Sequence, residues 1–139
     1  MPEKKAMDWL AGKTENENHT QISNEIAYFR DYYATLQPMV FLSYEREAYY
    51  SLNGDGFRVT FDDHILCRQE HLSLEEDVFG EPVLEEGKIL MELKTSGGIP
   101  LWMTEVLTAE HIYKTSFSKY GTAYQKLIFP KWKGEMRHV

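Results

Sequence analysis

The sequence predicts an α+β fold in which a mostly antiparallel, strongly curved sheet of about four or five strands carries helices on its outer face. A stretch rich in aromatic and branched residues, 39–51, is followed by the turn Asn53-Gly54-Asp55-Gly56 and then by an alternating stretch, 57–62. This order is typical of a β-hairpin. Helices expected at 20–37, 100–110 and 119–127 flank the strands, and Pro38 and Pro130 end the first and the last of them.

Length and composition describe one compact domain. The chain has 139 residues, of which 42% are hydrophobic, and a formal net charge of −7. The negative charge argues against a general nucleic-acid binder. Cys67 is the single cysteine, which excludes an intramolecular disulfide and a cysteine-based zinc site. Because no apolar run reaches membrane-spanning length and no leader-like segment follows Met1, we expect a cytoplasmic protein without a membrane span.

Helices are expected at the start of the chain. Residues 4–11 form a short amphipathic segment that Gly12 ends. Thr20 is a suitable N-cap for a second helix, which Pro38 terminates. The apolar positions of this second helix follow a helical period: Ile22, Ile26, Phe29, Tyr33 and Leu36. We therefore expect it to lie with this face on the sheet.

Two strands have one apolar and one charged face, because successive strand side chains point to opposite sides. In 57–62 the apolar face carries Phe57, Val59 and Phe61, and the other face carries Arg58, Thr60 and Asp62. In 89–94, Glu92 and Lys94 share the face opposite Met91 and Leu93. Arg46 belongs to the preceding strand, 39–51, and can reach the same charged face. Residues 70–87 are acidic and contain Gly80, Pro82 and Gly87, which predicts a surface excursion.

The last part of the chain predicts two more helices. Pro100 suits the first position of a helix that runs to about Glu110. Ser118 is a suitable N-cap for a helix from Lys119 to about Leu127, which Pro130 closes. A helix N-terminus presents free N–H groups and a partial positive charge, so Ser118 and Lys119 are candidates for binding an anion.

Two interpretations of the charged residues stay open on spacing alone. If helices cover the apolar side, the charged side lines a groove that holds phosphates, and Glu92 is placed to bind a divalent metal, because hard cations prefer carboxylate oxygen. Alternatively, the charges belong to an ordinary solvated sheet face and a capped helix. The five histidines lack zinc-site spacing, and the sequence contains neither a P-loop nor a G-x-S-x-G motif.

Four segments, in this order, resemble the VTC-domain proteins of bacteria, relatives of the polyphosphate polymerase of the vacuolar transporter chaperone complex within the triphosphate tunnel fold. They are Ser43-Tyr44-Glu45-Arg46-Glu47-Ala48-Tyr49, Arg58-Val59-Thr60-Phe61-Asp62, Met91-Glu92-Leu93-Lys94 and Thr115-Ser116-Phe117-Ser118-Lys119-Tyr120-Gly121-Thr122. The resemblance implies half of an eight-stranded antiparallel tunnel. It also implies basic residues along the tunnel, a glutamate that binds Mn²⁺ or Mg²⁺, and transfer of the γ-phosphate of ATP to polyphosphate.

The resemblance assigns roles to six residues of this sequence. Arg46 and Arg58 match tunnel arginines that hold phosphates, Glu92 matches the metal-binding glutamate, and Lys94 follows it on the same face. Ser118 and Lys119 match a phosphate-binding serine and lysine. Arg46, Arg58 and Lys94 would be the catalytic residues. A family lysine falls at Ser116 here, which weakens that end of the site.

The same resemblance divides the chain into an N-terminal helix and loop (1–18), the C-terminal half of a VTC-like tunnel domain (19–129) and a tail (130–139). The expected ligands are ATP, polyphosphate or triphosphate, with Mn²⁺ or Mg²⁺ as cofactor. The strands that begin the family domain are not found in this sequence. Two alternatives stay open: the chain is a truncated or split gene product, or a second chain, as a homodimer or a split partner, completes the sheet. Triphosphate hydrolysis on the same scaffold, and binding of polyphosphate or a partner without catalysis, remain alternatives to polymerisation.

Overall fold

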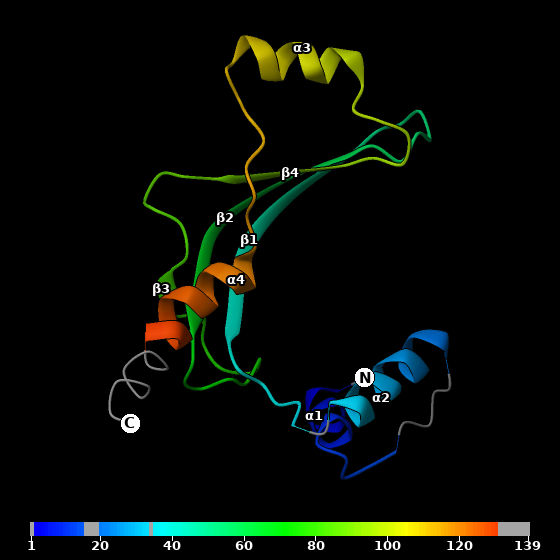
Figure 1. Cartoon of the computed structure of the whole chain (residues 1–139), viewed down its shortest axis with the longest axis vertical. Helices are drawn as coiled ribbons and strands as arrows, with labels where there is room; N and C mark the ends of the chain where they lie inside the picture. The colour runs from blue at the N-terminus through cyan, green and yellow to red at the C-terminus, as the bar shows by residue number, and fades with distance from the viewer. Residues whose placement is uncertain (1, 16–19, 34, 131–139) are drawn as a thin grey trace.

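The structure is a computed structural model that describes residues 2–15, 20–33 and 35–130. The order of its elements, coloured along the chain in Figure 1, is α1 (Glu3–Leu10), α2 (Gln21–Tyr32), β1 (Phe41–Tyr50), β2 (Arg58–Arg68), β3 (Glu81–Pro82), β4 (Leu90–Lys94), α3 (Leu101–Ala109), α4 (Lys119–Ala123) and the π-helical turn η1 (Tyr124–Ile128). The predicted α+β class is confirmed. Of the predicted tail, residues 131–139 lie outside the described ones.

The sheet is built around β2. One edge of β2 pairs with β1 and the other edge pairs with β3 and β4, and every pairing is antiparallel. Within the described residues, no strand pairs with the outer edge of β1 or of β4, so the sheet is open and not closed into a barrel. β1 and β2 are long and visibly curved, and they form the central part of the molecule (Figure 1).

The predicted apolar face of the hairpin is buried beneath α3. Phe57 and Val59 of β2 form a buried cluster with Met103 of α3. Other members of this cluster are partly buried: Phe61, Met91, Leu93 and Leu107. The strict alternation in β2 and β4 is what directs these side chains to one side of the sheet. The opposite face is thereby left to Arg58, Thr60, Asp62, Glu92 and Lys94.

An extra residue in β2 changes the face that the second half of this strand presents. Between the pairs Ser43–Leu66 and Glu45–Asp63, β2 contains one residue more than β1, and His64 has a φ of 46°. This arrangement is a β-bulge, which bends the strand and changes the direction of the side chains that follow. After it, Ile65 and Cys67 pack against Ala123 of α4. Burial raises the pKa of the Cys67 thiol, as expected for a packed rather than a reactive cysteine.

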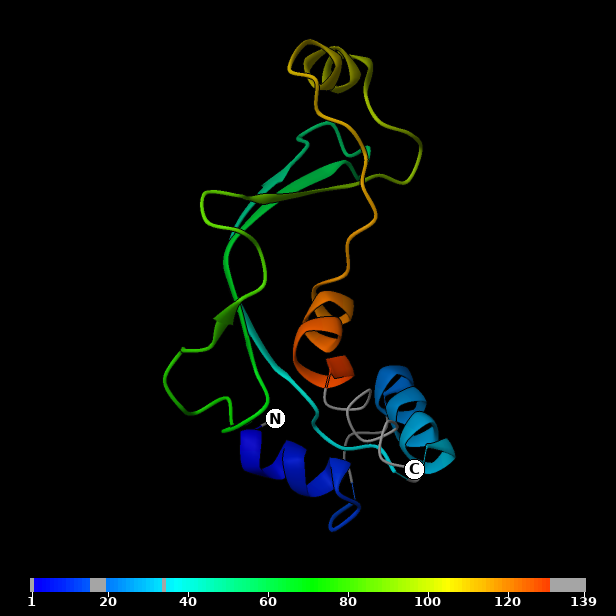
Figure 2. The same cartoon turned by 60° about the vertical axis from the view of Figure 1, so that its left-hand side comes forward.

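α3 and α4 therefore lie on opposite sides of the curved sheet. Figure 2 shows α3 above the outer side of the bend and α4 on the inner side, beside the lower half of β1 and β2. The extended segment between these helices runs back along the sheet from one to the other (Figure 2). The charged face of β2 and β4 and the start of α4 thus share the concave side.

The prediction for α2 is wrong in one respect. Thr20 caps the helix as expected, in a capping box with Ser23. However, α2 lies with α1 beyond the end of the sheet (Figures 1 and 2), and its apolar positions are largely exposed; Ile22, for example, is 70% exposed. Helical periodicity identifies an apolar face but does not specify which surface covers it. Instead, Arg30 of α2 donates a hydrogen bond to the carbonyl oxygen of Trp9 in α1, at 2.9 Å.

The acidic excursion after β2 is fixed to the sheet by Arg68. The guanidinium group of this buried residue lies between the rings of Phe41 and Phe79, at 3.5 and 4.2 Å from their centroids. It donates hydrogen bonds to carbonyl oxygens of the excursion: Glu70, His71, Ser73, Asp77 and Phe79. The short strand β3, which the sequence did not predict, then returns to the edge of β2.

No helix among the described residues is long and apolar enough to cross a bilayer.

Candidate functional site

A buried ion pair between β1 and β2 is at the centre of the concave face. Arg46 and Asp62 are direct cross-strand neighbours. The Nε atom of Arg46 lies 2.5 Å from Oδ1 of Asp62, and its second terminal nitrogen lies 2.7 Å from Oδ2. The carboxylate of Asp62 is completely buried, whereas the side chain of Arg46 is 31% exposed. One guanidinium therefore holds both oxygens of a carboxylate that solvent does not reach.

Lys119 joins this pair from the other end of the chain. Its Nζ atom lies 2.5 Å from Oδ2 of Asp62. The packing of Ala123 against Ile65 and Cys67 places the start of α4 at this point of the sheet. Ser118, the N-cap of α4, accepts a hydrogen bond from the N–H of Gly121 at 3.1 Å. The hydroxyl of Ser118 is therefore already engaged in capping its own helix.

The ring of Tyr44 lies beside both cationic groups. Its centroid is 5.0 Å from the guanidinium carbon of Arg46 and 4.8 Å from Nζ of Lys119. Both distances are in the range of cation–π contacts. Tyr44 therefore contacts both cationic groups, which also share the carboxylate of Asp62.

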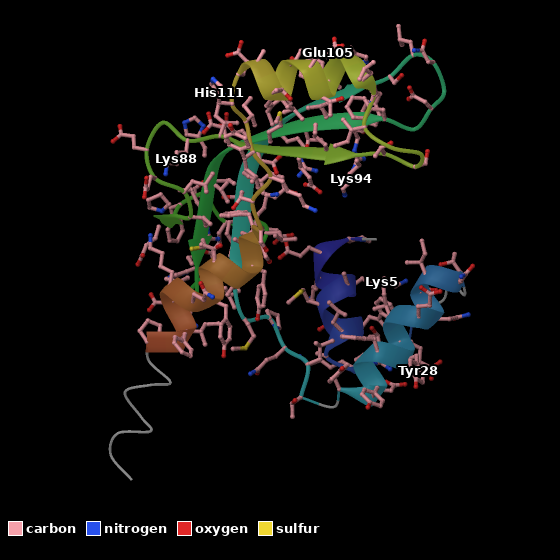
Figure 3. The ribbon with its side chains drawn as sticks, turned by 45° about the horizontal axis from the view of Figure 1, so that its top comes forward. Lys5, Tyr28, Lys88, Lys94, Glu105 and His111 are labelled. Atoms are coloured by element: carbon pink, nitrogen blue, oxygen red, sulfur yellow. The ribbon has the colours of Figure 1, made fainter. Side chains whose placement is uncertain are left out.

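Glu92 and Lys94 extend the cluster onto β4. An oxygen of Glu92 lies 3.3 Å from Nζ of Lys94, and the other lies 3.8 Å from Arg46. The side chain of Glu92 is 38% exposed, so it reaches solvent, unlike Asp62. Lys94 points away from α3 (Figure 3), as the alternation along β4 requires.

Polar atoms without a partner lie next to this cluster. Arg58 is the cross-strand neighbour of Lys94, and Thr60 is that of Glu92. Among the described residues, the Nε atom of Arg58 and the hydroxyl of Thr60 are buried and make no hydrogen bond. Buried polar atoms without a hydrogen-bond partner cost free energy, so this part of the sheet is destabilised by its own polar groups.

The electrostatics of the cluster favour an anion. The hydrogen bond from Arg46 holds the pKa of Asp62 below its ordinary value, and Lys119 lowers this pKa further, although burial acts in the opposite direction. The same hydrogen bond raises the pKa of Arg46. Four cations, from Arg46, Arg58, Lys94 and Lys119, surround two carboxylates, those of Asp62 and Glu92. The face therefore has excess positive charge on a chain whose formal net charge is −7.

All six residues singled out from the sequence lie in this part of the molecule. Arg46, Glu92, Lys94 and Lys119 are linked by ion pairs, Arg58 is opposite Lys94, and Ser118 precedes Lys119. Asp62, which connects β1 and β2 with α4, was assigned to the charged face from the sequence but was given no role. The signal that could have found it was its position on the same strand face as Arg58. We name these six residues together with Asp62 the cationic cluster.

The possible metal ligands in the cationic cluster limit the kind of metal that it could hold. Within the described parts of the chain there is no group of three or more His, Cys, Asp or Glu side chains close enough to bind one ion. Both oxygens of Asp62 are occupied by nitrogen donors. Glu92 is thus the one accessible carboxylate of the cluster. A single carboxylate fits Mg²⁺ or Mn²⁺ that takes its remaining ligands from water and phosphate oxygens.

Comparison with known proteins identifies a family for the chain. A family model described as "VTC domain" matches residues 2–128, which is most of the chain. No curated protein and no solved structure matches the chain. The matched range includes every residue of the cationic cluster.

Proposed function

The chain belongs to the VTC domain family, whose function is related to polyphosphate, and on this basis we propose that its cationic cluster binds the phosphate groups of polyphosphate, triphosphate or ATP. The observation that carries the proposal is the pair formed by Arg58 and Lys94, two cationic side chains that face each other on neighbouring strands. Like charges in directly opposite positions destabilise a sheet, and an anion between them removes the repulsion.

In this proposal each residue has a distinct part. Arg46, Arg58, Lys94 and Lys119 supply charge-assisted hydrogen bonds to phosphate oxygens. Ser118 keeps the start of α4, and with it Lys119, at the concave face. Glu92 would hold Mn²⁺ or Mg²⁺, and such an ion, when bound, neutralises charge on the phosphates.

We further propose that the cluster takes part in phosphoryl transfer from ATP to polyphosphate when further strands complete the tunnel. Transfer of this kind needs no covalent protein intermediate, because positioning and neutralisation of charge provide most of the catalysis. The outer edges of β1 and β4 have unpaired backbone groups in the described part of the chain, and a second chain could pair with them. Arg46, Arg58 and Lys94 would then be the catalytic residues.

Binding of inorganic tripolyphosphate to the whole chain, measured by calorimetry without metal, tests the proposal. Arg58→Ala should weaken binding by about tenfold or more, because a hydrogen bond to a charged group contributes roughly 1.5–3 kcal/mol. Lys88→Ala is the matched control, since it removes one positive charge from an exposed lysine that pairs with Glu85 outside the cluster. Equal affinity of the wild type and Arg58→Ala would remove Arg58 from the site.

The reaction is tested separately by its products. After incubation with ATP and Mn²⁺, polymerisation yields ADP and long polyphosphate chains, whereas hydrolysis yields ADP and orthophosphate without polyphosphate. If tripolyphosphate binds and neither product forms, the chain by itself is a binding module. Addition of a candidate partner chain then tests whether completion of the sheet restores transfer.

A further inference from the structure

We propose that Asp62 is a positioning residue that holds Arg46 and Lys119 together as one clamp for a single phosphate group. This inference rests on the proposed function, because the clamp is defined by what it binds. The carboxylate is fully buried, and its contacts come from two elements far apart in sequence, β1 and the start of α4. Since solvent does not reach it, Asp62 would act on a ligand only through the two cations.

Stability alone is a weak explanation for such a residue. Removing charges from water costs free energy, and a buried ion pair often contributes no more than well-packed apolar side chains would. What the arrangement does achieve is a fixed geometry. Arg46 uses two of its five N–H donors on Asp62, and Lys119 uses one of its three. The remaining donors belong to groups whose positions are already set.

The two cations would otherwise separate. Arg46 and Lys119 both lie against the ring of Tyr44, so their charges are close together and repel each other. Asp62 is the anion that both contact directly. A clamp that is ordered before the ligand arrives loses less side-chain entropy on binding, which increases affinity.

The proposal leads to a result opposite to the one expected from charge alone. Asp62 is negative and lies beside an anion site, so by Coulomb's law its neutralisation should strengthen phosphate binding. If Asp62 positions the two cations, its neutralisation should weaken binding instead. The sign of the change therefore separates positioning from a simple adjustment of charge.

The experiment measures binding of inorganic tripolyphosphate to the whole chain by calorimetry, in buffer with EDTA. Asp62→Asn keeps the size of the side chain and should lower affinity by about tenfold, the scale of one charge-assisted contact. Asp63→Asn is the matched control. It makes the same change of charge one residue away, at a side chain that is 48% exposed, and should leave affinity unchanged or slightly increased. Unchanged or tighter binding by Asp62→Asn overturns the proposal.

A double-mutant cycle excludes a general loss of structure. If Asp62 acts through Arg46, adding Asp62→Asn to Arg46→Ala should cause much less further loss of affinity than Asp62→Asn causes alone. An equal loss in both backgrounds indicates damage to the fold and overturns the proposal. The Nε–H resonance of Arg46, followed by NMR without ligand, should shift toward that of a free arginine in Asp62→Asn and stay unchanged in Asp63→Asn.

A second variant serves if Asp62→Asn does not fold. Arg46→Lys keeps the charge but cannot hold both carboxylate oxygens, and it should also weaken binding about tenfold; full affinity in this variant overturns the proposal.

A wild type that does not bind tripolyphosphate refutes the proposed function, and the proposed clamp is refuted with it. A wild type that binds while Asp62→Asn binds equally well refutes the clamp alone.

Discussion

Arg58 and Lys94 are direct cross-strand neighbours on β2 and β4, so two cationic side chains face each other on the concave side of the sheet. Among the described residues, the Nε atom of Arg58 is buried without a hydrogen-bond partner, whereas Lys94 contacts Glu92 at 3.3 Å. This arrangement is unfavourable for the isolated sheet and favourable for binding an anion. Stability and phosphate affinity should therefore respond in opposite directions when one of these charges is removed.

Lys94→Gln tests this relationship. Removal of the repulsion should leave the free energy of unfolding unchanged or raise it by about 0.2–1 kcal/mol, while affinity for tripolyphosphate falls by about tenfold. Urea denaturation and calorimetry measure the two quantities. Lys88→Gln, outside the cluster, should change neither by much. A clear loss of stability in Lys94→Gln would contradict the interpretation of the opposed charges.

Glu92→Gln should separate metal-dependent from metal-independent binding. Without metal, affinity for tripolyphosphate should stay the same or increase, because a negative charge next to Lys94 and Arg46 is removed. The increase in affinity that Mn²⁺ produces in the wild type should be lost. The measurement is calorimetric titration with and without Mn²⁺, and Glu45→Gln, an exposed site on β1, is the control. An unaltered response to Mn²⁺ would exclude Glu92 as the ligand.

Mn²⁺ alone should bind weakly. The cationic cluster offers one accessible carboxylate, and a divalent ion bound through so few protein ligands depends on phosphate oxygens. Calorimetry with Mn²⁺ should therefore give little signal until tripolyphosphate is added. Tight binding of Mn²⁺ to the chain without phosphate would reveal a metal site of a different kind.

The ion pair of Asp62 predicts a loss of stability in acid. Its pKa in the folded chain is below the ordinary value, mainly through the hydrogen bond from Arg46. Between the pKa of Asp62 in the folded chain and its higher pKa in the unfolded chain, the unfolded chain binds a proton that the folded chain does not. The stabilisation is therefore complete above the unfolded pKa of about 3.9 and is lost as pH falls through the folded pKa.

This loss is measurable as the dependence of the free energy of unfolding on pH. Denaturation at a series of pH values below about 4 should give a steeper decline for the wild type than for Asp62→Asn. Asp63→Asn should keep the slope of the wild type. Identical slopes in the wild type and Asp62→Asn would show that the pKa of Asp62 does not change on folding.

Met103→Ala should destabilise the attachment of α3 to the outer side of the sheet. Met103 is 8% exposed and packs with Phe57 and Val59, and truncating a buried methionine costs about 2–5 kcal/mol. The free energy of unfolding in urea measures this loss. Glu105→Ala is the control, because Glu105 is exposed on the side of α3 away from the sheet (Figure 3). Binding of tripolyphosphate to folded Met103→Ala should be unchanged, since the cationic cluster lies on the opposite face.

Arg68→Lys should loosen the excursion between β2 and β3. An ammonium group cannot replace the planar set of donors that reaches several carbonyl oxygens, nor the stacking between Phe41 and Phe79. We expect a loss of about 2 kcal/mol or more, because buried carbonyl groups are left unpaired. Limited proteolysis should show faster cleavage within residues 70–79. Arg30→Lys, which also loses donors to a backbone carbonyl, should leave this cleavage unchanged.

The sequence by itself determined the local structure and the two faces of the main strands. The turn at 53–56 predicted the hairpin, and strict alternation predicted that Phe57, Val59 and Phe61 would be covered while Arg58 and Thr60 faced the other way. Capping by Thr20 and Ser118 could also be predicted from the sequence, because a cap depends on neighbours three residues away. Such features depend on short-range geometry, which the order of residues specifies directly.

Only the tertiary structure decided how distant segments meet. The contact of Lys119 with Asp62 depends on the extra residue in β2, which turns Ile65 and Cys67 toward α4. The exposed position of α2 depended likewise on long-range packing, for which helical periodicity holds no information. Asp62 had no role assigned from the sequence because its partners come from β1 and α4, and a charged side chain acquires its function from the charges that folding brings beside it.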